Sequence, residues 1–503
     1  MRKQIKYNII EMIKTMYEAH SYIKVYTANK DREQANIILV DCQQAAIQLG
    51  TLIEESEGEE TVTISYLEDY CEAVYDVAMN ATEKKLEMLN DKLARVERSV
   101  ICDIKESIEV LFLPYKASMW DSMESIWRAA VNDPECEVFV VPIPYYDRNT
   151  DRSFGDYHYE GKDYPEYVPV IYYEEYNIKE HRPDIIFIHN PYDNCNYVTS
   201  VDTRFYSAEL KKYTECLVYV PYYLFPKKLE DYSLVFTPVL YNADVIIAQN
   251  EEVKDAYVCE LKRLQAIRGN RQCAVMALGT PKTDKIIHIS RNGINIPEEW
   301  VRLSGNKKKV FFNTNISLIL NNKELFTVNI YRVFELFNKR KDVFVIWREH
   351  PLTYETLKSM KSGIIEDYNK LKEYFVESRL GVIDTNVEAY EAIFFSDCYY
   401  GAGGSLVPIY ATTGKPMMIT AYKYPDNIID MEVGIETLLK QANVSMHFSE
   451  RYKNFLDLYL DNYEKIMEYK QKRYELLDEI TILSDGLVGD SIMKYVKNIE
   501  KLK

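Results

Sequence analysis

The sequence lacks the signals of several protein classes. Its 503 residues contain no apolar run approaching 18 residues, which argues against a transmembrane helix. The nine cysteines form no C-x-x-C pair, a pattern that fits a reduced compartment and disfavours both a disulfide framework and a zinc site. Basic residues are few: 61 Lys and Arg against 78 Asp and Glu leave a net charge of −17, which disfavours nonspecific nucleic-acid binding. The basic first residues lack a small-residue cleavage site, so we expect no signal peptide.

Proline is also absent before Pro114, and only Gly50 and Gly58 interrupt the first 104 residues. Apolar residues recur there at helical spacing, for example Ile9, Ile13 and Met16. This pattern predicts an all-α N-terminal module over residues 1–104 that packs as a bundle or forms a homo-oligomer. A role at a membrane surface is the alternative.

Beyond residue 105 the hydrophobic period changes. Short runs rich in Val, Ile and Phe, most of them separated by segments of helix length, predict two doubly wound parallel sheets. The predicted class is therefore α/β, with two facing Rossmann-like domains at residues 105–290 and 305–435 and C-terminal helices over 436–503. The expected strands are Val110–Leu113, Val138–Pro142, Asp184–His189, Leu217–Val220, Asp244–Ala248 and Ala274–Leu278 in the first domain, then Val310–Asn313, Val343–Trp347, Gly381–Ile383, Asp397–Tyr400 and Met417–Thr420.

Ligands of open α/β sheets bind beyond the carboxyl ends of the strands, which selects a few polar residues. In the first domain, Lys116 and Ser118 follow the first strand, where they either meet an anion or belong to a plain capped turn. The strand that ends at His189 is followed by a polar loop. Such a loop is costly unless its groups are hydrogen-bonded or contact a ligand. The candidates on it are His189, Asn190, Tyr192 and Asp193.

In the second domain, a glycine turn between a strand and a short helix predicts a diphosphate site at Gly403, Gly404 and Ser405, or else a tight turn without a ligand. Arg348 and His350 end a strand on the same face, where a guanidinium and an imidazole can bind phosphate. The same residues could instead satisfy buried carbonyl groups. Three further candidates are each balanced against a structural role: Lys282, Asp284 and Lys415.

These motifs, in this order and spacing, resemble the CDP-glycerol glycerophosphotransferase family, the teichoic acid primases and polymerases. Gly279, Pro281, Lys282 and Asp284 match its G-x-P-[KR]-x-D segment, and Arg348, His350 and Pro351 match R-x-H-P. The strand–D-Y-S-S–helix–K-P segment is matched in part, by Asp397, Ser405, Lys415 and Pro416. Where the family has a His-Gly pair after a strand, this chain has Pro221-Tyr222-Tyr223.

The resemblance implies a GT-B fold and a cytoplasmic transferase, with peripheral attachment to the inner face of the membrane as a further expectation. The donor would be a nucleotide diphosphate, with CDP-glycerol suspected, and the acceptor an envelope glycan or polyol phosphate. His189, oriented by Asp193, is the candidate replacement for the missing histidine as general base, with His350 beside the leaving phosphate. No D-x-D or other metal motif occurs, so we expect a metal-independent reaction without a cofactor. The alternative is a non-catalytic scaffold that binds nucleotide or glycan.

Overall fold

The computed structural model describes most of the chain. The described residues are 1–58, 60–149, 151–225, 235–268, 273–315, 326–350, 353–354, 357, 362–402, 406–411, 413, 415–420, 428–429 and 486–502. By compactness the chain divides into two units. The first comprises residues 1–111, 130–139 and 182–185, and the second comprises 112–129, 140–181 and 186–503.

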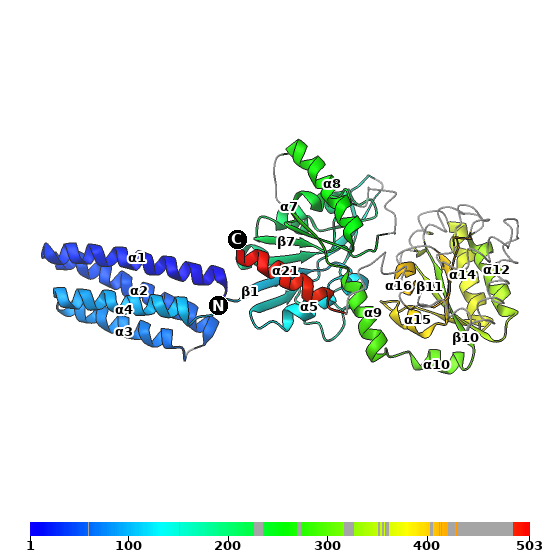
Figure 1. Cartoon of the computed structure of the whole chain (residues 1–503), viewed down its shortest axis with the longest axis horizontal. Helices are drawn as coiled ribbons and strands as arrows, with labels where there is room; N and C mark the ends of the chain where they lie inside the picture. Colours follow the sequence, from blue (N-terminus) through cyan, green and yellow to red (C-terminus); the bar gives the residue numbers. More distant parts are fainter. Residues whose placement is uncertain are drawn as a thin grey trace. The chain divides into compact units, whose positions relative to one another are not determined.

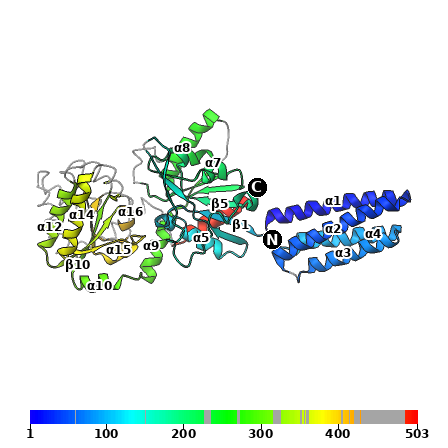
Figure 2. The ribbon, with the colours of Figure 1, turned by 180° about the vertical axis from the view of Figure 1, so that it is seen from behind.

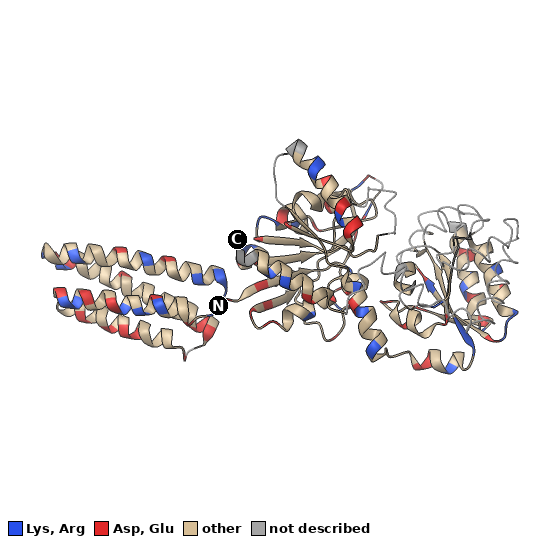
Figure 3. Ribbon diagram, in the orientation of Figure 1, with Lys and Arg blue, Asp and Glu red and all other residues tan. Residues whose placement is uncertain are grey.

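Four antiparallel helices make up the N-terminal module (Figure 1). They are α1 (Lys3–Ala28), α2 (Arg32–Glu57), α3 (Val62–Met79) and α4 (Glu83–Cys102). Asp31, Thr61 and Thr82 cap the last three by accepting a hydrogen bond from a backbone N–H of the first turn. One apolar core runs from Met1 to Ile104, and basic and acidic residues both occur along the helices (Figure 3). The module is therefore a packed four-helix bundle, as its apolar spacing predicts.

The first α/β domain is built on a six-stranded sheet with the order β2-β1-β5-β7-β8-β9. All six strands expected from the sequence are present. Strands β7, β8 and β9 pair in parallel, as short Val- and Ile-rich runs separated by helices predict. The bounds are β1 (Ile108–Leu113), β2 (Cys136–Val140), β5 (Ile185–Ile188), β7 (Cys216–Tyr219), β8 (Val245–Ala248) and β9 (Ala274–Ala277), with α5 (Glu124–Val131), α6 (Ile178–His181), α7 (Ser207–Leu210), α8 (Glu251–Arg268) and the short 3₁₀ turns η1 (Ala117–Ser122), η2 (Asp193–Cys195), η3 (Thr203–Phe205) and η5 (Pro238–Tyr241).

A second, antiparallel sheet in this domain was not expected from the sequence. Its strands are β3 (Tyr145–Arg148), β4 (Phe154–His158) and β6 (Thr199–Val201), in the order β4-β3-β6. Tyr145 lies opposite both His158 and Val201, so these three side chains share one face of the small sheet.

The second α/β domain contains the sheet β12-β11-β10-β13-β14-β15, in which only the edge pair β14–β15 is antiparallel. All five predicted strands of this half are present, and residues of α12 and α14 pack on β10, β11 and β13 in one core. The bounds are β10 (Lys308–Thr314), β11 (Val343–Glu349), β12 (Gly381–Ile383), β13 (Cys398–Ala402), β14 (Met417–Thr420) and β15 (Ile428–Ile429), with helices α12 (Phe326–Asn338), α14 (Ser362–Glu377), α15 (Tyr390–Phe395) and α16 (Leu406–Ala411). Two Rossmann-like domains and a helical N-terminal region confirm the predicted GT-B-like fold class.

Two helices connect the domains, and a third returns to the first one. The segment from Ile287 onward continues α9 (Pro281–Asn292) and then forms α10 (Glu298–Ser304). The last helix, α21 (Val488–Leu502), contacts α9 and β7 and lies beside α5 in both views (Figures 1 and 2). The terminal helix therefore packs against the first α/β domain. No helix among the described residues is long and apolar enough to cross a membrane.

Candidate functional site

A cavity of about 1060 Å³ lies where the carboxyl ends of strands from both α/β domains converge. Six residues predicted from the sequence line it: Lys116, Ser118, Tyr192, Lys282, Arg348 and His350. Five other predicted residues are not among its lining: His189, Asn190, Asp193, Asp284 and Lys415. Gly403, Gly404 and Ser405, the predicted diphosphate turn, lie outside the described residues.

Lys116 brings a positive charge to the cavity from the loop after β1. Its Nζ lies 4.7 Å from the ring centre of Tyr145, and within the described part of the chain it makes no ion pair or hydrogen bond. Burial lowers the pKa of Lys116, and the carboxylates of Glu160 and Asp147 act in the opposite direction. An ammonium held in this way gains most from an anionic ligand.

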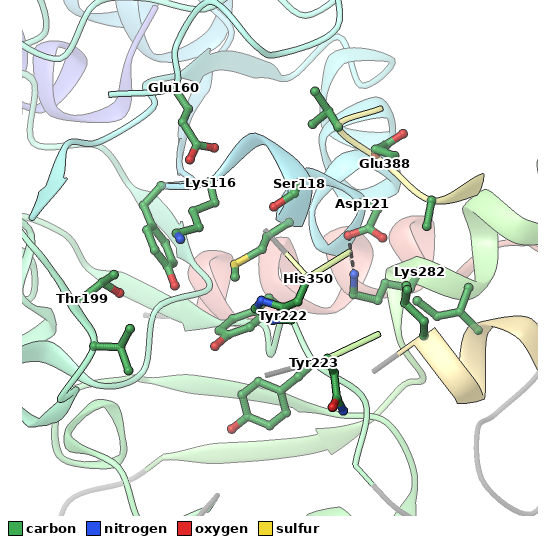
Figure 4. Close-up of a pocket in the computed structure, with 18 of the residues that line it drawn as sticks. Lys116, Ser118, Asp121, Glu160, Thr199, Tyr222, Tyr223, Lys282, His350 and Glu388 are labelled. Atoms are coloured by element: carbon green, nitrogen blue, oxygen red, sulfur yellow. Dashed lines mark hydrogen bonds and ion pairs between the residues drawn. The ribbon is translucent and has the colours of Figure 1, made fainter. Parts of the chain in front are cut away.

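His350 follows β11 and lines the same cavity (Figure 4). Its pKa is lowered first by burial, then by the positive charges of Lys116 and Arg348. The side chains of Lys116 and His350 therefore come from different domains but share one electrostatic environment. A phosphate between them would relieve the repulsion.

Arg348 lines the cavity, yet its guanidinium is already engaged. Nη1 donates to Asp384 Oδ2 at 2.6 Å and to the carbonyl of Glu388 at 3.0 Å, and Nη2 donates to the carbonyl of Val387 at 3.1 Å. The side chain of Asp384 is fully buried. The geometry thus favours the structural alternative left open by the sequence, in which Arg348 holds the loop between β12 and α15.

Lys282 is also neutralised. It forms a buried ion pair with Asp121 (Figure 4). The other oxygen of Asp121 accepts a hydrogen bond from Tyr390 at 2.7 Å. One turn along α9, Lys285 lies 2.6 Å from Glu388 and 3.0 Å from Glu124. These buried ion pairs connect α9, η1, α5 and the α15 region. They therefore stabilise the cavity wall, and their charges are already neutralised before a ligand binds.

His189 occupies a structural position. Its Nε2 accepts the backbone N–H of Tyr115 at 3.1 Å, so the ring proton resides on Nδ1, which lies 3.1 Å from Ser122 Oγ. The side chain is fully buried, and burial lowers the pKa of His189 to about 3. Both ring nitrogens are committed, so the geometry favours the structural role for His189 over that of a general base.

The expected partner of His189 also points elsewhere. Asp193 accepts hydrogen bonds from the backbone N–H and the hydroxyl of Ser207, at 2.9 and 2.6 Å. Burial raises the pKa of Asp193, and the two hydrogen bonds from Ser207 lower it by less. The side-chain oxygen of Asn190 accepts a long hydrogen bond from the backbone N–H of Tyr192. The polar groups of Asn190 and Asp193 are thus hydrogen-bonded within the domain.

Asp284 and Lys415 complete secondary structure as well. Asp284 accepts from the backbone N–H groups of Val488 and Gly489, at 3.1 and 2.8 Å, and so caps α21. Lys415 donates to the carbonyls of Ile393 and Phe394 at the end of α15, at 3.1 and 2.7 Å. These contacts are the structural roles that the sequence left open for both residues.

Several residues of the cavity wall were not singled out from the sequence. Glu160 accepts from the Tyr145 hydroxyl and from the N–H of Ala117, at 2.6 and 2.8 Å, and so fixes the start of η1. Tyr115, Tyr145, Tyr222 and Tyr223 give the first domain an aromatic wall. In a chain with 43 tyrosines, composition alone could not distinguish these four. No cluster of His, Cys, Asp and Glu among the described residues has the geometry of a metal site.

Comparison with protein families finds none that matches the chain, and comparison with curated proteins finds no relative. Solved structures are similar at low identity. A UDP-N-acetylglucosamine 2-epimerase aligns at 12% identity with a TM-score of 0.48, covering 79% of this chain and 98% of its own. A putative UDP-N-acetylglucosamine 2-epimerase from Listeria monocytogenes aligns at 13% identity with a TM-score of 0.46, and the alignment covers 79% of this chain and 98% of the epimerase. The wall teichoic acid polymerase TagF aligns at 12% identity with a TM-score of 0.46, and the alignment covers 87% of this chain and 98% of the TagF chain. The proposed function therefore rests on the cavity and on the motifs.

Proposed function

We propose that this protein is a GT-B transferase that moves a glycerol-phosphate or sugar group from a nucleotide-diphosphate donor, with CDP-glycerol as the first candidate, to an envelope glycan or polyol-phosphate acceptor. The observation that carries the proposal is the ammonium group of Lys116 in the cavity beside His350. Two cationic or protonatable groups, both partly desolvated and contributed by facing domains, suit a diphosphate that bridges them.

In this proposal the donor diphosphate lies between Lys116 and His350, and its negative charge increases at the leaving phosphate as the bond to the transferred group breaks. Lys116 stabilises that charge, and protonated His350 can donate a hydrogen bond to the leaving oxygen. Arg348, Lys282 and Asp121 act as supports, because each is already paired within the wall.

Calorimetry with CDP and UDP tests the donor site directly. Lys116→Met should weaken nucleotide binding by roughly 1.5–3 kcal/mol, the range for a hydrogen bond to a charged group. Lys179→Met is a matched control, since Lys179 also lies over a tyrosine ring, that of Tyr213, on an exposed helix away from the cavity. Equal nucleotide affinities of the two variants and the unsubstituted chain would contradict the proposal.

The buried position of His189 favours one alternative, a scaffold that binds nucleotide or glycan without turnover. A nucleotide-binding scaffold would share with the transferase the binding of nucleotide by Lys116, but only the transferase releases nucleotide from a donor. Nucleotide release from CDP-glycerol and from a panel of UDP-sugars therefore separates the two.

A further inference from the structure

The small antiparallel sheet carries a histidine–carboxylate pair on the wall of the cavity. His158, the last residue of β4, lines the cavity and is 38% exposed in its side chain. Its ring stacks on Tyr145 with centroids 4.9 Å apart, as expected for residues directly opposite in neighbouring strands. Asp147 follows two positions after Tyr145 in β3 and so shares the face of His158.

The pair fixes the protonation pattern of the imidazole ring. Asp147 Oδ2 lies 2.9 Å from His158 Nε2, and a carboxylate can only accept, so Nε2 carries the ring proton. Nδ1 is then left with its lone pair, and it makes no hydrogen bond within the described part of the chain. A carboxylate on one ring nitrogen orients the imidazole and stabilises the imidazolium that forms when the other nitrogen takes a proton.

The pair also lies close to the group assigned to the donor. Lys116 Nζ and the His158 ring both contact the ring of Tyr145, at 4.7 and 4.9 Å from its centre. His158 therefore lies one aromatic ring from the ammonium that would hold the diphosphate. It belongs to the first domain, whereas His350 belongs to the second.

We propose that His158 is the general base that activates the acceptor hydroxyl, with Asp147 as its positioning residue; this inference rests on the proposed transferase function. His158 Nδ1 takes the hydroxyl proton as the acceptor oxygen forms its bond to the transferred group. The bond from that group to the leaving phosphate oxygen breaks, and the electron pair departs on that oxygen. The imidazolium then returns its proton to water, and no oxidant, reductant or further reactant is needed.

His158 satisfies the requirements that His189 does not. A general base needs an open lone pair and access to substrate. His189 has both nitrogens engaged and no exposed surface, while His158 keeps one nitrogen open on a cavity wall.

The test uses the full-length protein with CDP-glycerol and a panel of UDP-sugars as donors, and with glycerol phosphate and N-acetylhexosamine oligosaccharides as acceptors. His158→Ala and His158→Gln should lower kcat by about 10²–10⁴-fold, the usual worth of general-base help, with nucleotide affinity unchanged. The glutamine amide can still donate to Asp147, so this variant keeps the fold while lacking a base. His288→Gln on the exposed side of α9 is the control and should keep full turnover.

Two readouts separate catalysis from folding. Imidazole in solution should restore part of the activity of His158→Ala. Asp147→Asn should lower kcat without raising KM, and imidazole should not restore the activity of this variant. Normal turnover in both His158 variants would overturn the assignment and leave the transferase proposal intact. Absence of turnover in the unsubstituted chain with every donor would overturn both, while nucleotide binding through Lys116 would still be measured independently.

Discussion

At the scale of single residues, the site is decided by which polar groups are already hydrogen-bonded. His189 follows β5, Arg348 ends β11, Asp284 lies in the first turn of α9 and Lys415 precedes β14. The contacts of all four side chains are internal. Lys116 differs because, in the part of the chain that the structure describes, its ammonium group lies over an aromatic ring and forms no ion pair or hydrogen bond. A sequence shows that a polar residue follows a strand, but it does not show which backbone carbonyl or amide is near it.

The buried His189 predicts a pH dependence of stability. Its pKa is about 3 in the folded chain against about 6.5 in the unfolded one, so the unfolded state binds the extra proton between these values. The free energy of unfolding should therefore be fully developed above about pH 6.5 and fall as the pH is lowered towards 3. Urea unfolding of His189→Gln across this window should show a shallower slope. An identical slope in both proteins would contradict the internal role.

His350 predicts a pH dependence of binding. Its pKa is lowered in the free protein by burial and by Lys116 and Arg348, and a bound diphosphate should raise it. Affinity for CDP-glycerol, whose phosphates keep a constant charge here, should increase as the pH falls through the pKa that His350 has in the complex. Calorimetry in buffers of different ionisation enthalpy should record proton uptake on binding, and His350→Asn should abolish it. Equal uptake by this variant would place the proton elsewhere.

Replacing Arg348 by alanine should lower the stability of the protein rather than selectively weaken nucleotide binding. Removing the guanidinium leaves the carboxylate of Asp384 buried and unpaired, which should cost about 3–5 kcal/mol of unfolding free energy. Urea unfolding followed by tryptophan fluorescence measures this. The double variant Arg348→Met/Asp384→Leu should recover much of the loss, because it removes both charges together. If Arg348→Ala unfolds like the unsubstituted chain but no longer binds nucleotide, Arg348 contacts the donor after all.

At the scale of elements, apolar strands were predictable and polar ones were not. The eleven expected strands of the two large sheets are all present because each contains a short apolar run. Of these strands, β1, β5, β7, β8 and β13 are buried along their whole length. Strands β3 and β4 were missed because YYDR and FGDYH mix aromatic, acidic and basic residues. A period-two reading across the polar residues between them would have predicted a hairpin and, with it, His158 opposite Tyr145.

Two glycines should respond oppositely to alanine. Gly401 in β13 has φ +146°, and an added Cβ would lie 2.1 Å from the carbonyl oxygen of Asn313 on β10. Gly401→Ala should therefore destabilise the second domain by more than about 3 kcal/mol or abolish soluble protein. Gly50 in α2 has open space around its Cβ position, so Gly50→Ala should stabilise the bundle by about 0.5–1 kcal/mol. Thermal unfolding of both variants checks the pair, and a tolerated Gly401→Ala would show that β10 and β13 can move apart.

At the scale of the whole molecule, the bundle should fold by itself. Its core contains residues between Met1 and Ile104 only, and three of its four helices carry side-chain caps. A chain truncated after residue 105 should show a helical circular dichroism spectrum and a cooperative thermal transition. A chain beginning near Ser107 should retain nucleotide affinity, since every residue lining the cavity follows position 111. Loss of that affinity in a folded truncated protein would make the bundle part of the site.

The four tryptophans give each α/β domain its own optical signal. Trp120 and Trp127 lie in η1 and α5 of the first domain, Trp300 in the connecting α10, and Trp347 in β11 of the second, while the bundle has none. Intrinsic fluorescence is therefore blind to α1–α4, whereas circular dichroism at helical wavelengths is weighted towards them. Melting curves from the two methods should diverge if the bundle unfolds separately. Trp120, which precedes the lysine-bound Asp121 and follows Lys116 by four residues, should also change its emission when a nucleotide enters the cavity.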